Sequence, residues 1–391
     1  MSSVWRKVII CVSLVGLVAC VKTQGTSTPE PLQVTPTLTQ ALKTAQATTE
    51  GGARTASQTA SPTVIASLAP PSPKPSPFLP IDLTPLGSDN IIQLQLLATL
   101  PVQEIYQLAF SVQGDKLVTL SEPWDDRFND YLQVWDLEHG VQLLDLQRLP
   151  SPAQAFFSPD ESQVYVFFAS EGIDVYDLVL GEKIHAIALS DDQLGFSIGS
   201  ISIALAKYQD YGDSSIVRLV DLATEQEQLS FTEPGMVMSL KLSPDGSLLA
   251  IGSQIGNHFR ISVREIPSQR LVTDLVDYDS GLVFSPDNSL AAISKNGQVT
   301  LFSSPWMTWK ASYGFSDIFT NPMPMDFSWS DGNKLLALED RNTVRFLVAE
   351  TGKELFSLPD ACEVKFSPDA VILVSWCYQG DLKIWGVSPG S

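Results

Sequence analysis

One phrase recurs along the chain from residue 90 onward. A short apolar strand ends in Phe-Ser or a close equivalent, and the chain then turns through Pro-Asp-Gly or a near copy. Proline presets φ at the second turn position, aspartate caps the turn, and Gly or Asn accepts a positive φ. Each copy is therefore predicted to form a β-hairpin. The serines of the seven copies are Ser111, Ser158, Ser197, Ser243, Ser285, Ser330 and Ser367.

These copies follow one another with a mean period of about 43 residues, and each unit has room for four strands. After the hairpin comes a third strand with alternating apolar residues, such as 131–137, and a fourth strand after a short turn, such as 140–146. Four short strands in a unit of this length are typical of a propeller blade. The sequence thus predicts an all-β fold over residues 90–391: a seven-bladed β-propeller of four-stranded blades.

The end of one third strand, Trp135-Asp136-Leu137, carries a dipeptide that names a large propeller family. Tyr176-Asp177-Leu178 and Val220-Asp221-Leu222 are degenerate copies of it. Over about 300 residues the region resembles a WD-repeat β-propeller. The Gly-His pair that usually begins each repeat of that family is absent, so its buried polar network is not carried over, and a related bacterial propeller subfamily fits as well.

The seventh unit contains only three strands, at 362–366, 372–376 and 382–385. Residues 91–97, just before the first copy, stand where a fourth strand stands in every other unit. We expect them to pair in the last blade, because this closes the ring and covers two exposed strand edges.

The first residues have the pattern of a secretory signal. Arg6 and Lys7 precede an apolar run at 8–19, which is shorter than the roughly 20 residues that a membrane span needs. The run ends in Leu17-Val18-Ala19-Cys20, which resembles the bacterial lipobox. That resemblance implies a signal peptide at 1–19 and a lipidated, palmitate-bearing Cys20 that holds the protein on the outer side of a membrane in the cell envelope. An ordinary signal peptide with a cysteine near its cleavage site is the alternative.

Residues 20–89 are predicted to be a disordered tether. Of residues 21–89, 31 are Ser, Thr or Pro, and no aromatic residue occurs before Phe78, so the segment cannot build a core. As a flexible coil it would span about 45 Å. A proline-rich docking motif and a glycosylated stalk are the alternatives to a plain spacer.

Cys362 and Cys377 both belong to the seventh unit. Counting outward from the turn at 367–370 places them opposite or nearly opposite each other on adjacent strands, and the envelope permits disulfides. A register change of one residue would separate the two side chains. A disulfide and a pair of buried thiols therefore both remain open.

The propeller region carries 18 Lys and Arg against 40 Asp and Glu, a net charge of -22. Such a surface repels a phosphate backbone, which excludes nucleic acid as a partner, and it repels anionic lipid headgroups, which leaves the lipid anchor as the contact with the membrane. The excess of negative charge keeps the protein soluble, or it provides a face that binds cations or basic proteins.

Patterns that suggest chemistry are weak. Gly195-Phe196-Ser197-Ile198-Gly199 matches G-x-S-x-G, but Ser197 is a repeat serine between two strands, where that motif does not work. The three histidines are scattered, and no metal or phosphate motif occurs, so we expect no metal and no cofactor. The carboxylate pairs at 125–126 and 191–192 could act as acid and base or hold calcium. Neighbouring carboxylates are common in so acidic a chain, and we expect no enzymatic activity.

Aromatic residues interrupt the repeats on one rim of the propeller. The loops that join second to third strands, and each fourth strand to the next blade, share this rim, and exposed aromatic side chains typically anchor binding surfaces. Rings that fold back over their own blades are the alternative. The predicted binding rim consists of Trp124, Asp125, Asp126, Phe128, Tyr208, Tyr211, His258, Phe259, Phe315 and Phe319.

Together these patterns predict a monomeric, lipid-anchored, non-catalytic propeller that binds an envelope protein or peptide, with a basic partner favoured by the charge. A propeller enzyme that acts on glycans or lactones through rim carboxylates is the first alternative. A small-ligand sensor at the central channel is the second. The fold itself does not decide among these functions.

Overall fold

The computed structural model describes most of the chain from Phe78 onward. These residues belong to one compact unit. For residues 195–198, 294–295, 314 and 340 it describes the backbone alone. The described residues are 78–80, 82–122, 130–150, 152–168, 172–189, 195–198, 202–209, 213–278, 282–295, 298–304, 307–314, 327–330, 332, 334–340 and 342–389.

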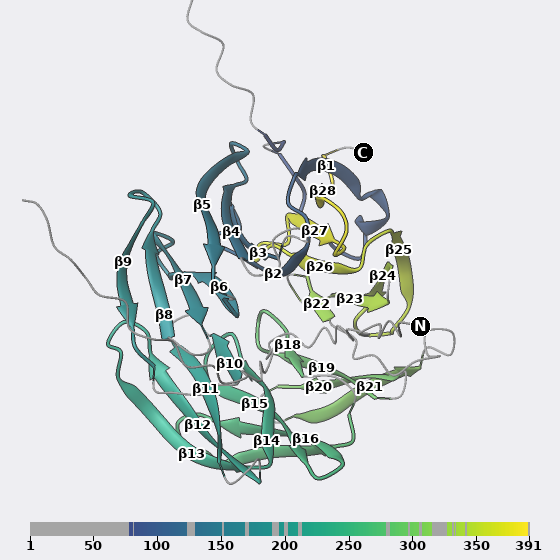
Figure 1. Ribbon diagram of the computed structural model, residues 1–391. Helices are drawn as coiled ribbons and strands as arrows, with labels where there is room; N and C mark the ends of the chain where they lie inside the picture. Colours follow the sequence, from purple (N-terminus) through teal and green to yellow (C-terminus); the bar gives the residue numbers. More distant parts are fainter. Residues whose placement is uncertain are drawn as a thin grey trace, which may run out of the picture. The chain divides into compact units, whose positions relative to one another are not determined.

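Seven antiparallel sheets of four strands each follow one another around a ring (Figure 1). Blade 1 contains β2 (Ile105–Phe110), β3 (Lys116–Ser121), β4 (Asp130–Asp136) and β5 (Val141–Leu149). Blade 2 contains β6 (Gln154–Phe157), β7 (Gln163–Phe168), β8 (Gly172–Asp177) and β9 (Glu182–Ile187). Blade 3 contains β10 (Gly195–Ile198), β11 (Ser202–Gln209), β12 (Ser214–Asp221) and β13 (Glu227–Pro234). Blade 4 contains β14 (Met236–Leu242), β15 (Leu248–Ile255), β16 (His258–Glu265) and β17 (Leu271–Val276).

The remaining blades have the same order of strands. Blade 5 contains β18 (Val283–Phe284), β19 (Leu290–Lys295), β20 (Gln298–Ser303) and β21 (Thr308–Gly314). Blade 6 contains β22 (Phe327–Trp329), β23 (Leu335–Asp340), β24 (Thr343–Val348) and β25 (Glu354–Pro359). Blade 7 contains β26 (Glu363–Phe366), β27 (Ile372–Trp376), β28 (Leu382–Gly386) and, from the other end of the chain, β1 (Gln95–Leu100). The predicted seven-bladed, four-stranded propeller is thus confirmed.

The repeat serine holds each first hairpin together. In the six blades whose serine side chain is described, the serine is buried, and its Oγ accepts a hydrogen bond of 2.9–3.2 Å from the backbone N–H five residues later. In four of them the same hydroxyl donates to the aspartate two residues on, as Ser243 does to Asp245 at 2.7 Å. Asp245 also accepts from the Ser247 N–H at 3.0 Å, so the predicted aspartate cap is present.

The aspartate of the Trp-Asp dipeptide caps the second hairpin of a blade. Asp136 Oδ1 accepts from the backbone N–H groups of Glu138 at 2.9 Å and His139 at 3.0 Å. Asp177 and Asp221 do the same in blades 2 and 3. The residue before each aspartate is buried. The first residue of the dipeptide therefore packs in the core, and the second caps the turn.

Seven hydrophobic clusters fill the spaces between neighbouring blades. Each contains strand residues from two adjacent sheets, and one of them joins the last blade to the first, where Leu382 and Ile384 lie in one cluster with Leu108 and Leu117. Because every blade packs on both neighbours, the ring is closed.

The N-terminal strand completes the last blade, as predicted. β1 pairs antiparallel with β28, with Thr99 opposite Lys383 and Leu100 opposite Leu382. The predicted bounds of 91–97 were wrong at both ends, because Ile91–Gln93 form a short 3-10 helix, η1, and the strand runs from Gln95 to Leu100. Ile91 is fully buried with residues of blades 6 and 7. Because η1 turns this side chain inward, the extended strand begins only at Gln95.

The segment before β1 packs on the propeller as well. The Phe78 N–H donates to Glu138 O at 2.9 Å, the Thr84 N–H to Val387 O at 2.9 Å and the Leu86 N–H to Ala370 O at 2.7 Å; Leu86 is buried. Contacts of the chain with the propeller are therefore described from Phe78 onward. The predicted signal peptide, Cys20 and the tether up to residue 77 lie outside the described residues. Within the part of the chain that is described, no helix is long and apolar enough to cross a membrane.

Candidate binding rim

The antiparallel order of the strands gives the propeller two rims. The connections from second to third strands and from blade to blade lie on one side, which we call the loop rim, and the two hairpin turns of each blade lie on the other, which we call the turn rim. Along the sequence, the loop-rim segments contain 15 acidic and two basic residues, against ten and three for the turn-rim segments. The loop-rim segments are 101–104, 122–129, 150–153, 169–171, 188–194, 210–213, 235, 256–257, 277–282, 296–297, 315–326, 341–342, 360–362 and 377–381.

Two loop-rim connections meet where blade 7 joins blade 1. The Gln103 Nε2 donates to Asp381 Oδ1 at 2.8 Å, and the Glu104 N–H donates to Tyr378 O at 2.9 Å. Glu104 has a left-handed backbone, with φ of 58°, and its carbonyl accepts from the Glu122 N–H at 3.1 Å. These bonds fix the walls of a shallow hollow of about 410 Å³, which we call the blade 7 hollow. Its lining residues are Gln103, Glu104, Gln379 and Gly380.

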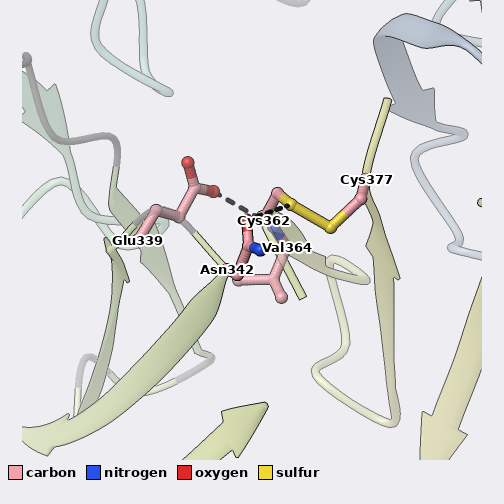
Figure 2. Close-up of a disulfide and its surroundings, with 5 residues drawn as sticks. All are labelled: Glu339, Asn342, Cys362, Val364 and Cys377. Atoms are coloured by element: carbon pink, nitrogen blue, oxygen red, sulfur yellow. Dashed lines mark hydrogen bonds between the residues drawn. A yellow bond between two sulfur atoms is a disulfide. The ribbon is translucent and has the colours of Figure 1, made fainter. Parts of the chain in front are cut away.

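A disulfide lies at the same end of blade 7. Cys362, just before β26, is bonded to Cys377, just after β27, with the two Cα atoms 4.9 Å apart (Figure 2). Of the two states that the sequence left open, the structure has the disulfide. The Cys362 N–H also donates to Trp376 O at 3.2 Å. The hollow therefore borders a loop that is covalently fixed at its first residue.

Blade 6 supports this bonded end from the side. Glu339 Oε1 accepts from the Val364 N–H at 3.0 Å, and Asn342 Oδ1 lies 3.6 Å from Cys362 Sγ (Figure 2). A disulfide sulfur carries no hydrogen, so the Asn342 contact is not a hydrogen bond. The Glu339 bond crosses from one blade to the next and fixes the start of β26.

Three of the predicted rim residues are described, and all three belong to blades 3 and 4. Tyr208 is half-buried on β11, its hydroxyl lies 3.8 Å from Met238 Sδ of blade 4, and burial raises the pKa of Tyr208. His258 is exposed, with Nδ1 3.0 Å from Asp277 Oδ1, and Phe259 beside it is half-buried. Tyr208 thus folds back against the neighbouring blade, whereas His258 and Asp277 present an exposed polar pair.

The other predicted rim residues lie outside the described residues, so their part in the rim stays a prediction. They are Trp124, Asp125, Asp126, Phe128, Tyr211, Phe315 and Phe319.

A buried carboxyl lies on blade 1 at the loop-rim end of β4. Asp130 is 7% exposed, and burial raises its pKa to about 6, with a further contribution from the charge of Glu122. Tyr106 lies beside it, and its hydroxyl donates to Pro152 O at 2.9 Å. Burial and the nearby Asp130 charge raise the pKa of Tyr106 well above its usual range. A carboxyl with so altered a pKa is a candidate functional group.

The sequence contained a signal for each of the residues that its analysis missed. Asp130 is in phase with Leu132 and Val134 in an alternating strand, and that phase places its side chain inward. Residues 378–381 read Tyr-Gln-Gly-Asp, and the longer loop at 208–213 reads Tyr-Gln-Asp-Tyr-Gly-Asp. The shorter loop repeats the order of the longer one, but its length does not mark it as an interruption.

The described part of the rim offers polar and acidic contacts. Among the described residues no group of three or more His, Cys, Asp or Glu side chains could hold a metal ion. On the innermost strands, Gln107 bonds both to Ala155 O and to the Ala155 N–H, and Lys365 Nζ donates to Leu108 O at 3.1 Å. These inner polar groups join neighbouring blades.

Comparison with known proteins identifies the fold. No protein-family model and no curated protein matches the chain. The chain is similar to the β-propeller domain of Cps50 (Swd1) from Myceliophteria thermophila, with a TM-score of 0.59 and 14% identity over 75% of this chain and 100% of that one. It is also similar to Kuenenia stuttgartiensis hydrazine synthase, with a TM-score of 0.57 and 16% identity over 72% of this chain and 94% of that one. In all, 1555 chains of solved structures match, so the likeness shows the propeller and indicates no single function.

Proposed function

We propose that the protein is a lipid-anchored, extracytoplasmic scaffold whose loop rim binds a basic segment of an envelope protein or peptide, without chemistry of its own. The observation that carries this proposal comes from the sequence: the connections that form the loop rim contain 15 acidic residues against two basic ones, and six of the acidic residues and neither of the basic ones are among the described residues. Charge of one sign on one face attracts an oppositely charged partner and orients it as it arrives.

The blade 7 hollow is the strongest described part of this surface. Glu104 and Asp381 supply negative charge at its edge, and Tyr378, which is 42% exposed, supplies an aromatic side chain beside it. Tyrosine buries a large area with few rotatable bonds and is common among the residues that dominate binding. The disulfide and the hydrogen bonds of Gln103 and Glu104 hold these groups in place before a partner arrives, which lowers the entropic cost of binding.

The anchor in this proposal is Cys20. The lipobox-like Leu17-Val18-Ala19-Cys20 and the proline-rich segment after it support an attached domain on a long spacer. Two or three acyl chains hold a protein on a membrane stably, whereas one chain binds reversibly.

Direct binding of peptides tests the rim. Fluorescence anisotropy with dye-labelled Lys- and Arg-rich peptides is expected to show binding that weakens as salt is raised. Replacing both Glu104→Gln and Asp381→Asn should weaken it several-fold. The matched control on the turn rim, Glu138→Gln with Glu350→Gln, removes the same charge and should leave the affinity unchanged. Equal losses in both variants, or no binding of any basic peptide, would overturn the proposal.

A pull-down from envelope extract then identifies the partner. The variant with alanine at Trp124, Tyr211 and Phe259 tests the aromatic residues of the predicted rim. A partner retained by the wild type and lost by this variant, while the variant stays folded, would extend the rim to blades 1, 3 and 4.

The second candidate is a propeller enzyme that acts on glycans or lactones. The observation that favours it is the raised pKa of the buried Asp130 carboxyl, because a carboxyl that keeps its proton closer to neutral pH can act as a general acid. The residues that line the blade 7 hollow do not include Asp130, which ranks this candidate second. Turnover of any glycan or lactone that Asp130→Asn abolishes, with the fold intact, would reverse the ranking.

A further inference from the structure

Half of the exposed large apolar side chains that are described lie at the turn rim. Among the described residues, twelve large apolar side chains are exposed, and six of them stand in a turn of the turn rim or within two residues of it. Three stand on the loop rim. The six, which we call the turn-rim apolar set, are Val112, Val141, Val179, Leu180, Leu271 and Trp309.

The β8–β9 turn of blade 2 is the most apolar of these turns. Val179 is 90% exposed and Leu180 65% exposed at its tip. Their backbone N–H groups both donate to Asp177 Oδ1 at 2.8 Å, so the turn is fixed while the two side chains project outward. At the equivalent positions blade 1 has Glu138 and His139. Two exposed aliphatic side chains at a fixed tip are unfavourable in water unless another surface covers them.

The N-terminal part of the chain joins the propeller on the same rim. The first described residue, Phe78, donates its N–H to Glu138 O in the β4–β5 turn, at the tip of that hairpin. Phe78, through which the earlier residues are linked to the propeller, therefore lies on the turn-rim side.

We propose that the turn rim is a membrane-facing surface, which touches a neutral phospholipid layer through the turn-rim apolar set and so directs the loop rim away from the membrane. This inference rests on the anchor at Cys20 that the proposed function assigns. The anchor keeps the propeller at high local concentration near the lipid, so that a few shallow apolar contacts are enough to orient it.

The arrangement of the set favours lipid over a protein partner. Its members stand on turns of blades 1, 2, 4 and 5, spread around the ring. A lipid layer can contact several separated turns of one rim at the same time, whereas a protein interface needs one contiguous, closely packed patch. Trp309, which is 64% exposed, is of a residue type that concentrates at the boundary between lipid and water.

Charge decides the kind of lipid. The turn rim has fewer acidic residues than the loop rim, but it still has ten against three basic ones. Anionic headgroups would repel it, so neutral headgroups fit best. The more acidic loop rim is the less favourable of the two rims for contact with any membrane.

Quenching by labelled lipid tests the orientation. The full lipidated chain is placed in phosphatidylcholine vesicles that contain a nitroxide-labelled lipid, with a fluorescent dye on Glu182→Cys at the turn rim or on Asn257→Cys at the loop rim. We expect quenching at position 182 and none at position 257. Val179→Asp with Leu180→Asp should abolish the quenching at 182, and Ile255→Asp, an exposed aliphatic residue on the loop rim, should leave it unchanged. Added phosphatidylglycerol should weaken it.

Flotation of the vesicles separates the two proposals. If the chain floats with the vesicles and both positions are quenched equally, the orientation is overturned while the anchor and the peptide-binding rim stand. If the chain does not float, the anchor at Cys20 is overturned and this inference with it, while binding of basic peptides is still measured in solution. If Val179→Asp with Leu180→Asp leaves the quenching unchanged, the turn-rim apolar set is not the contact.

Discussion

The repeat serine is the residue on which each first hairpin depends. Replacing Ser243→Ala leaves the buried Leu248 N–H and the Asp245 carboxylate each without one partner. A buried donor left without its partner costs about 1–3 kcal/mol, so we expect the free energy of unfolding to fall by about that amount, measured in urea. Ser268→Ala removes an exposed hydroxyl that bonds Glu265 Oε2 at 2.7 Å, and it should change stability by less than about 0.5 kcal/mol. Equal losses in the two variants would contradict this role.

Asp130 makes stability depend on pH. The carboxyl has a raised pKa of about 6 in the folded protein, against about 4 when unfolded. Below pH 4 the carboxyl is protonated in both the folded and the unfolded state, so its burial costs no stability. Between about pH 4 and 6 the unfolded state loses this proton while the folded state keeps it, so the free energy of unfolding falls as pH rises. Above pH 6 the carboxyl is ionised in both states and the free energy of unfolding falls no further on its account. The free energy of unfolding of the Asp130→Asn variant, relative to that of the wild type, should therefore rise by up to about 3 kcal/mol between pH 4 and pH 7. The measurement is urea unfolding of both proteins across this pH range. A difference in free energy of unfolding that stays constant with pH would contradict the prediction.

At the scale of single elements, the disulfide links the two strands on either side of the β26–β27 turn. The bonded cysteines are 15 residues apart, and in the chain-entropy model a loop of that size stabilises by about 3 kcal/mol. We expect reductant to lower the free energy of unfolding by about this amount. The double variant Cys362→Ser with Cys377→Ser should start from the lower value and show no response to reductant. A wild type whose urea midpoint is the same with and without reductant would contradict the prediction.

The strands could be predicted from sequence because their determinants are local. A turn of Ser-Pro-Asp-Gly and an alternating strand are complete within a few residues, so the count of blades and of strands per blade followed from them. The start of β1 could not be predicted in this way, because Ile91 turns inward to fill a space between blades 6 and 7. The extended chain begins only after that contact is made.

The rim was harder to predict for the same physical reason. Tyr208 lies near the end of β11, but the position of its hydroxyl depends on Met238, which belongs to the next blade. The cysteines were predicted to within one residue of register, and Glu363 opposite Trp376 supplies the missing information, since Cys362 and Cys377 are the next pair outward. The positions of these side chains thus depend on contacts between strands and between blades, which a pattern within one segment of sequence does not contain.

At the scale of the whole molecule, the ring depends on a strand from each end of the chain. Deleting residues 90–98 removes η1 and most of β1, which exposes the edge of β28 and opens the cluster that joins blades 6 and 7. We expect the product to aggregate, as measured by the soluble fraction after expression and by size-exclusion chromatography. Deleting residues 38–46, nine residues of the predicted tether, should leave the propeller soluble. A monodisperse, cooperatively unfolding product of the first deletion would show that closure is dispensable.

The pairing of β1 with β28 also sets the order of events during synthesis. β1 leaves the ribosome long before its partner β28, and the hydrogen bond from Gln103 to Asp381 joins residues that are 278 positions apart. Loop-closure entropy must be met before so distant a contact forms, which makes the final step slow. A chain that ends before β26 therefore has six complete blades and a single strand of the seventh, and the propeller closes only after β28 has been made.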